Sequence, residues 1–136
     1  MVTAAAVGEY EVDLSWAPAA DNMGVTGYGI YRNGTLVATA AGVSYADTGL
    51  ADGRDDTYGV DAFDSAGNRS ALSGSAAATT PDVTPPSTPA GLSAVSVGAS
   101  AIGVSWQPST DDVGVAGYTV YRDGAAIATV AAPATV

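Results

Sequence analysis

The sequence predicts an all-β sandwich, and three observations favour it. Several short segments carry apolar residues at every second position, which is the period of a strand with one buried face. Two-residue turns that suit tight hairpins follow some of these segments, and no stretch shows helical periodicity. A string that begins at Asp21, DNMGVTGYGIYRNG, also returns almost unchanged at Asp111 as DDVGVAGYTVYRDG. The chain of 136 residues therefore holds repeated β-structure.

The first clear strand is EVDLSW, at residues 11–16. Its apolar residues alternate with polar ones, and AIGVSW at residues 101–106 repeats the pattern in the same register. The apolar members should face a core because a half-buried strand turns every second side chain inward. These members, both tryptophans included, are Val12, Leu14, Trp16, Ile102, Val104 and Trp106.

The next strands are GYGIYR at 27–32 and GYTVYR at 117–122, each followed by a hairpin. Asn33-Gly34 ends the first and Asp123-Gly124 the second, and both pairs tolerate the positive φ of a type I′ turn. TLVATA and AAIATV return as the partner strands. Tyr28 and Ile30 are expected on one face, and Tyr31 on the other.

Only the first copy continues beyond its hairpin. VSYADTGL predicts a strand and a corner that ends at Leu50, and RSALSGSAAATT predicts a final strand. Between them, DDTYGVDAFD alternates inward Tyr58, Val60 and Ala62 with outward residues. Asp61 belongs to the outward set, so we expect water to solvate it.

The repeat sets the boundaries. Trp16 falls on Trp106 with a constant offset of 90 residues (106 minus 16), the size of one small sandwich domain. A proline-rich stretch between the copies cannot join a sheet ladder and favours an extended connection. We expect a first module at 1–80 that lacks part of its start, a linker at 81–88, and at 89–136 the first half of a second module. An uncovered half-module should be marginal alone, which favours mobility or self-association.

Composition excludes several classes of function. Fourteen acidic residues against four basic ones give a net charge of −10, which disfavours nucleic acid and anionic membranes as partners. Cysteine and histidine are absent, so thiol chemistry, cysteine or histidine zinc sites and a histidine base are excluded. The first residues do not form a signal peptide, and no apolar run is long enough to cross a membrane. We expect no catalytic residue, metal or cofactor.

Two acidic loops offer oxygen ligands for calcium: Asp21 with Asn22, and Asp111 with Asp112. The alternative is that these side chains bond their own backbone and shape the loop. No run of alternating ligands resembles a calcium loop, so the backbone interpretation is favoured, although the sequence leaves calcium binding open.

Paired carboxylates could in principle act as the acid and base of a glycosidase. The candidates are Asp55 with Asp56, and Asp61 with Asp64. That mechanism needs a cleft and a carboxylate with a raised pKa, and a small sandwich has a filled interior. We interpret these aspartates as solvated surface charges.

Exposed aromatic rings could stack on a sugar. With both tryptophans assigned to the core, Tyr31, Tyr121 and Tyr10 are the candidate carbohydrate contacts. Outward tyrosines also pair across strands, and that alternative is favoured.

Three motifs stand out: TPPSTPAGL, VSW.PSTDDVGVAGYTVYRDG and the Y.V.A.D.AGN.S ending. Together they resemble the bacterial fibronectin type III modules of secreted polysaccharide-degrading enzymes such as chitinases and cellulases. The resemblance implies an immunoglobulin-like sandwich of seven strands in two sheets, with one nearly complete module followed by a truncated one. Asp56 stands where the family usually has a corner tyrosine, so we expect a looser corner.

The resemblance implies a non-catalytic spacer in a secreted bacterial carbohydrate-active enzyme, with neighbouring domains of the same extracellular protein as partners. The alternative is a weak carbohydrate-binding or cell-surface adhesion module that acts through its tyrosines, with polysaccharide as partner. The sequence does not name the parent enzyme or its substrate.

Overall fold

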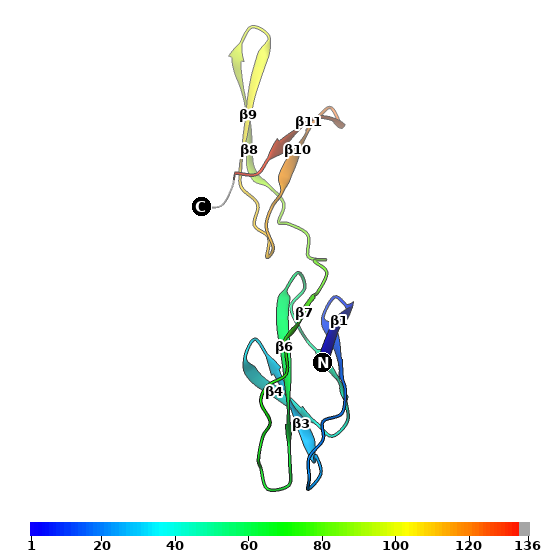
Figure 1. Ribbon diagram of the computed structural model, residues 1–136. Coiled ribbons are helices and arrows are strands. Elements are labelled where there is room, and N and C mark those ends of the chain that lie inside the picture. Colours follow the sequence, from blue (N-terminus) through cyan, green and yellow to red (C-terminus); the bar gives the residue numbers. More distant parts are fainter. Residues whose placement is uncertain (134–136) are drawn as a thin grey trace. The chain divides into compact units, whose positions relative to one another are not determined.

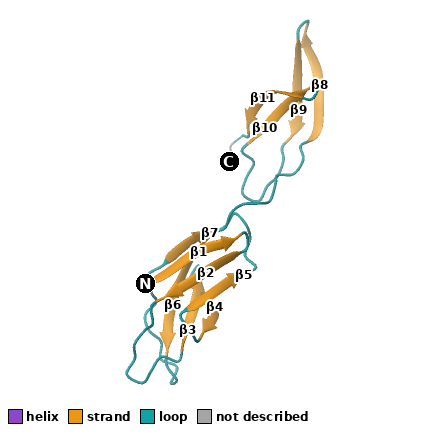
Figure 2. Cartoon of the chain, turned by 90° about the vertical axis from the view of Figure 1, so that its right-hand side faces the viewer, coloured by secondary structure: helices purple, strands orange, loops and turns teal. Residues whose placement is uncertain are grey.

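The computed structural model describes residues 1–133, and the chain divides into two units, Met1–Val83 and Thr84–Val136 (Figure 1). All regular elements in this part of the chain are β-strands (Figure 2). Over the same residues, no helix has the length and apolar character needed to span a membrane. The predicted all-β class is confirmed.

Unit 1 consists of two antiparallel sheets, which confirms for this unit the expected seven strands in two sheets. The three-stranded sheet has the order β1-β2-β5, with β1 (Val2–Gly8), β2 (Glu11–Trp16) and β5 (Ser44–Thr48). The four-stranded sheet has the order β4-β3-β6-β7, with β4 (Thr35–Ala40), β3 (Gly27–Arg32), β6 (Asp55–Phe63) and β7 (Ala76–Thr79).

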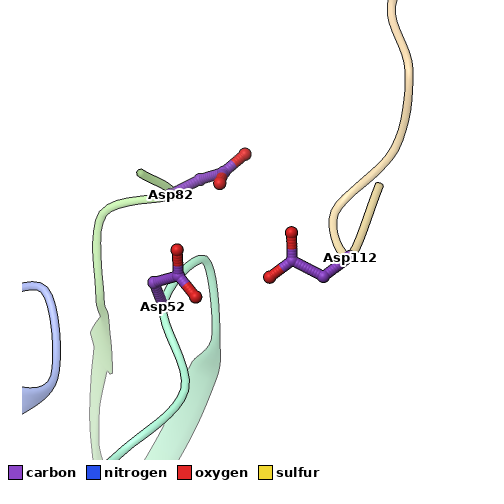
Figure 3. Close-up of side chains that lie close together, drawn as sticks. All are labelled: Asp52, Asp82 and Asp112. Carbon is purple, nitrogen blue, oxygen red and sulfur yellow. The ribbon is translucent and has the colours of Figure 1, made fainter. Parts of the chain in front are cut away.

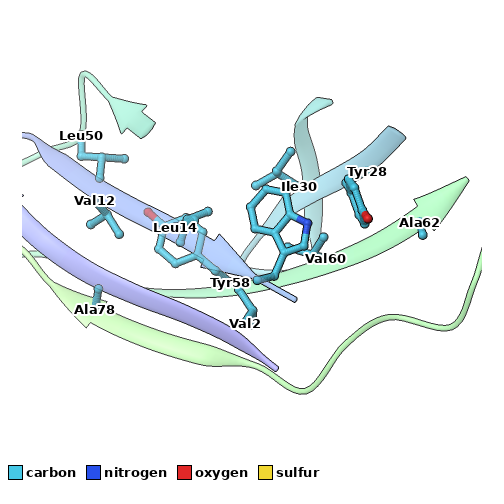
Figure 4. Close-up of a cluster of buried hydrophobic side chains, with 11 residues drawn as sticks. Val2, Val12, Leu14, Tyr28, Ile30, Leu50, Tyr58, Val60, Ala62 and Ala78 are labelled. Carbon is cyan, nitrogen blue, oxygen red and sulfur yellow. The ribbon is translucent and has the colours of Figure 1, made fainter. Parts of the chain in front are cut away.

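The core of unit 1 lies between these sheets, where their alternating inward side chains meet (Figure 4). Trp16 is 8% exposed and packs edge-on against Tyr28, with ring centroids 5.5 Å apart. The hydroxyl of Tyr28 accepts a hydrogen bond from the Ala19 N–H at 3.0 Å. The buried members are Val2, Val12, Leu14, Trp16, Tyr28, Ile30, Leu50, Tyr58, Val60, Ala62 and Ala78.

The β3–β4 hairpin turns at Asn33 and Gly34, with φ angles of 50° and 80°. Asp123 and Gly124 in unit 2 have nearly the same values, 51° and 79°. Positive φ at both central residues is what a type I′ turn requires, so both predicted turns are present.

The final strand of unit 1 is shorter than the sequence suggested. Only Ala76–Thr79 pairs with β6 as a strand. The segment before it runs beside β6 through backbone bonds from Ser70 to Ala62 and from Ser73 to Val60. The two serine hydroxyls accept hydrogen bonds from the N–H groups of Ala62 and Val60, both at 2.9 Å, so side chains replace part of the ladder.

Unit 2 consists of two hairpins, β8 (Ala90–Gly98) with β9 (Ala101–Gln107) and β10 (Gly117–Arg122) with β11 (Ala125–Ala131). Trp106 and Tyr118 repeat the ring contact of unit 1, at 5.3 Å. The sequence predicted Trp106 to be a core residue, but it is only half-buried. Among the described residues, no strand of unit 2 corresponds to β5, β6 or β7 and covers it.

Candidate functional site

The three candidate tyrosines are not gathered into one platform. Tyr10 lies in the turn between β1 and β2 and is 48% exposed, whereas Tyr31 lies on the other sheet of unit 1. Tyr31 is half-buried, and its hydroxyl donates to Asp61 Oδ2 at 3.0 Å. Tyr121 belongs to unit 2 and is 65% exposed. A ring that is partly covered and whose hydroxyl is engaged offers a sugar less surface than a free one.

Asp61 is buried, which corrects the expectation that it is a solvated surface charge. It is 5% exposed and accepts hydrogen bonds from Arg69 Nη1 at 2.7 and 2.9 Å. The Gly29 N–H also donates to it, at 3.1 Å. Gly29 has no side chain to keep the carboxylate away from β3, and the arginine, whose guanidinium lies 5.0 Å from the ring centre of Phe63, covers it.

The other carboxylates that were weighed as an acid–base pair are occupied by structural contacts. Asp64 accepts bonds from the N–H groups of Ala66 and Asn68, both at 2.9 Å, and from the Asn68 amide. The Asn68 side-chain bond and these backbone bonds lower the pKa of Asp64. Asp55 accepts a bond from the Thr79 hydroxyl. A lowered pKa is the opposite of what a general acid requires.

Asp56 fills the corner where a tyrosine was expected. It is 2% exposed, and its Oδ1 accepts bonds from Arg54 Nε at 2.9 Å and from the Asn33 amide. Asn33 in turn accepts a bond from the Thr57 N–H at 2.9 Å. The corner is therefore held by an ion pair and an amide from the β3–β4 turn, and the expected looseness is wrong.

A second polar cluster closes the core between the two sheets. Arg32 Nη1 lies 2.8 Å from Asp47 Oδ2, and the Tyr58 hydroxyl donates to the same oxygen at 3.0 Å. Burial, followed by the bond and the negative charge of Asp47, raises the pKa of Tyr58 above its ordinary value of 10.0. Burial opposes the charge of Arg32, but the bond to Asp47 and the negative charges of Asp47 and Asp56 together outweigh burial and raise the pKa of that arginine.

Local sequence patterns did not predict these ion pairs, although the composition of the chain contained a signal for them. All four basic residues of the chain are arginines, and three of them lie in unit 1. Each of the three pairs with a buried aspartate: Arg32 with Asp47, Arg54 with Asp56, and Arg69 with Asp61. Scarce cations in an acidic chain are thus used for structure.

The acidic loops bond their own backbone. Asp21 Oδ2 accepts the Met23 N–H at 2.9 Å. Asp111 Oδ2 accepts the N–H groups of Val113 at 3.1 Å and of Gly114 at 2.8 Å. These are the contacts of Asx turns, which fix the shape of the loops that precede β3 and β10.

One further aspartate, Asp52, helps to fasten the end of unit 1. Figure 3 labels Asp52, in the loop before β6, and Asp82, which follows β7; Asp112, also drawn, belongs to unit 2. Asp52 accepts a bond from the Val83 N–H at 3.1 Å. Thr80, which is 1% exposed, donates to the Ala51 carbonyl at 2.8 Å. The chain that leaves β7 is therefore tied to unit 1 as far as Val83.

Unit 1 has a cavity beside Trp16, of about 160 Å³, lined by Met1, Val2, Trp16, Tyr28 and neighbouring residues. Sites for small molecules usually measure roughly 300–1,000 Å³. The cavity is thus smaller than a typical ligand site.

Relatives of the chain are polysaccharide-degrading enzymes. Over 132 residues the chain is 42% identical to Exoglucanase B of Cellulomonas fimi, covering 92% of this chain and 12% of that enzyme. Over 123 residues it is 39% identical to Chitinase A1 of Niallia circulans, covering 87% of this chain and 18% of that enzyme. The chain therefore spans less than a fifth of either relative.

Solved structures identify the fold. A Fn3-like protein from Clostridium thermocellum matches with a TM-score of 0.52 and 26% identity, covering 62% of this chain and 92% of that one. The chain resembles fibronectin type III modules in sequence and shares their fold. No profile of a protein family matches it. Because a fibronectin type III module is non-catalytic, and the hydrolases are matched only over 12% and 18% of their length, the chain itself is not an enzyme.

Proposed function

We propose that this chain is a spacer in a secreted bacterial glycoside hydrolase and that it positions neighbouring domains outside the cell. One observation carries the proposal: the chain aligns over 92% of its own length with 12% of an exoglucanase, and over 87% with 18% of a chitinase. A segment shared by enzymes with different substrates suits a task that is independent of the substrate.

The architecture of unit 1 supports this proposal. It has a buried hydrophobic core between two sheets, its three arginines hold buried carboxylates, and its last residues are tied to the domain. A packed domain joined by proline-rich chain restricts its neighbours more than a flexible tether does. We assign residues 1–80 to one module, 81–88 to the linker and 89–136 to the first half of another.

A linker exchange tests the spacer proposal. In the hydrolase that carries this sequence, residues 1–83 are replaced by a glycine-serine segment of equal length. We expect unchanged kcat/KM on a soluble oligosaccharide and slower hydrolysis of insoluble polymer, because only the insoluble polymer requires neighbouring domains to act at a set separation. Equal rates on insoluble polymer, or an equal loss on both substrates, would contradict the proposal.

A second candidate is weak contact with polysaccharide, which the exposure of Tyr10 and Tyr121 favours. Electrophoresis of the chain through gels containing chitin, cellulose or xylan tests it. Retardation that Tyr121→Ala or Tyr10→Ala removes, with Tyr31→Ala as the comparison, would support binding over spacing. The same contact on a cell-surface glycan would provide adhesion.

A further inference from the structure

Asn33-Gly34 is the one Asn-Gly pair in the sequence. In such a pair the backbone nitrogen of the glycine can attack the side-chain amide carbon of the asparagine, because glycine brings no side chain into the path of the reaction. A C–N bond forms, the amide nitrogen leaves as ammonia, and water then opens the cyclic imide to aspartate or isoaspartate. One water is consumed and one ammonia is released, so this deamidation needs no enzyme, metal or oxidant.

The other two asparagines of the chain provide a comparison. Asn22 precedes Met23, and Asn68 precedes Arg69. A side chain at the following position hinders the attacking nitrogen, so both sites should react more slowly than Asn33 in an unfolded chain. Local sequence therefore favours deamidation at Asn33.

The folded turn holds the Asn33 side chain at both ends of its amide. Its Oδ1 accepts bonds from the Thr57 N–H at 2.9 Å and from the Thr57 hydroxyl at 3.2 Å. Its Nδ2 donates to Asp56 Oδ1, and its backbone N–H donates to the Thr57 carbonyl at 2.8 Å. The amide carbon can turn toward the Gly34 nitrogen only after the side chain gives up its contacts on β6. The folded unit 1 should therefore suppress the reaction.

Packing does not shield the pair from water. Asn33 and Gly34 are exposed, and a Cβ added to Gly34 would meet nothing within 4 Å. Protection of Asn33 therefore depends on its contacts with Asp56 and Thr57. An exposed turn opens at a lower free energy than a core strand does, so these contacts can break before unit 1 unfolds as a whole.

The product of the reaction suits this corner poorly. An aspartate at position 33 loses the amide donation to Asp56 and places a second carboxylate beside one that is 2% exposed. Oδ2 of Asp56 already has no hydrogen-bond partner in the part of the chain that the structure describes. Ionised carboxylates only accept hydrogen bonds, and like charges at this separation repel each other. Deamidation should thus weaken the corner.

Unit 2 separates the effect of the turn from the effect of Asp56. Asp123 occupies the position of Asn33 in the second copy, with a φ of 51° against 50°. The type I′ turn itself therefore accepts an aspartate. The cost expected in unit 1 comes from the buried carboxylate of Asp56, which bonds to the turn.

We propose that Asn33 is a site of spontaneous deamidation, which its contacts with Asp56 and Thr57 suppress while unit 1 is folded. The reaction proceeds when the β3–β4 turn separates from β6, and the new carboxylate then opposes the return of the turn. Because the reaction is not reversed, the protein retains a covalent mark of such an opening.

Peptide mapping by mass spectrometry tests the protection. The full chain is incubated at mildly alkaline pH, with and without guanidinium chloride above the unfolding transition. Asn33 should deamidate at least roughly tenfold faster in the unfolded chain, because local opening no longer limits the reaction. Asn22, which is exposed in the folded chain, reports any effect of the denaturant on the chemistry itself. Equal rates at Asn33 in the folded and unfolded chain would overturn the proposal.

Substitution in the full chain tests the cost of the product. Asn33→Asp should lower the urea midpoint of the unit 1 transition, whereas Asn22→Asp, which adds the same charge in an exposed loop, should leave it unchanged. Adding Asp56→Asn to Asn33→Asp supplies an amide donor to the new carboxylate. This double variant should fold even if Asn33→Asp alone does not, and it should be more stable than the two single losses predict.

Two results of this second test would also overturn the proposal. One is an equal midpoint for Asn33→Asp and Asn22→Asp. The other is a double variant that fails to fold or whose loss of stability is the sum of the single losses, because the carboxylate at position 33 would then not act through Asp56.

Discussion

At the scale of single residues, the unexpected feature is the number of aspartates that unit 1 buries. Asp47, Asp56 and Asp61 are 5%, 2% and 5% exposed. Removing such charges from water is costly, and an arginine and further hydrogen bonds offset that cost for each carboxylate, although Oδ2 of Asp56 has no hydrogen-bond partner in the described part of the chain. Leaving one partner unpaired would therefore destabilise the fold more than the pair itself stabilises it.

Tyr58 should make unit 1 sensitive to alkaline pH. Its pKa is raised in the folded state, so its contribution is complete below the unfolded pKa of about 10 and is lost as pH rises toward the higher folded value. Between these values the unfolded chain releases a proton that the folded chain keeps. The free energy of unfolding should then fall by about 1.4 kcal/mol per pH unit.

Urea unfolding of unit 1, followed between pH 8 and pH 11, measures this slope. Tyr58→Phe should be less stable at pH 8, because the bond to Asp47 is lost, but it should show a shallower decline above pH 10. An identical alkaline slope in both proteins would show that another group is responsible.

At the scale of elements, the pairing of β3 with β6 depends on glycine. A Cβ added to Gly29 would lie 2.5 Å from Asp61 Oδ1 and 2.7 Å from Arg69 Nη1. Gly59 likewise lies under the side chain of Leu72. These glycines let polar and apolar side chains of the 69–73 segment lie close to the sheet, where they cover its outer face.

Gly29→Ala should therefore destabilise unit 1 by about 1–3 kcal/mol, because the Asp61–Arg69 pair must move from its place. Gly8→Ala is the matched control, since nothing lies within 4 Å of the added Cβ. The control should be neutral or slightly stabilising, because alanine restricts the unfolded chain. Urea unfolding compares the two, and equal stability would contradict the packing argument.

At the scale of the whole molecule, the two units differ in how completely their cores are covered. Unit 1 buries the cluster around Trp16 between two sheets, whereas unit 2 leaves the corresponding positions on two hairpins open to solvent. Apolar burial is the main favourable term in folding, so unit 2 has much the weaker source of stability.

Consequently, a fragment of residues 1–83 should unfold at the same urea concentration as unit 1 does in the full chain. Amides of β10 and β11 should exchange faster than those of β3 and β6, because local stability follows buried contacts. Hydrogen exchange combined with circular dichroism checks both statements. A single transition that shifts when residues 84–136 are removed would show that the units depend on each other.

Much of this fold follows from local sequence. The alternation in EVDLSW places Val12, Leu14 and Trp16 on one face of their strand, and in unit 1 that face is buried. The Asn33-Gly34 turn is equally local, because only a few residue types accept its positive φ. The candidate carbohydrate contact at Tyr31 was harder to predict. The Tyr31 hydroxyl bonds to Asp61 and Arg69, and both of these residues are distant from it in sequence.

The sequence by itself determined the β class, the repeat, the inward residues and the hairpin turns, because each rests on a short-range rule of backbone geometry. Only the tertiary structure decided which aspartates are buried and which arginines pair with them. Whether Asp61 meets water or Arg69, whether Asp56 loosens its corner or closes it, and whether Trp106 is covered all depend on strands that pair across long stretches of chain. Burial is a property of such pairings, so a periodic pattern can name the face of a residue but not what lies over it.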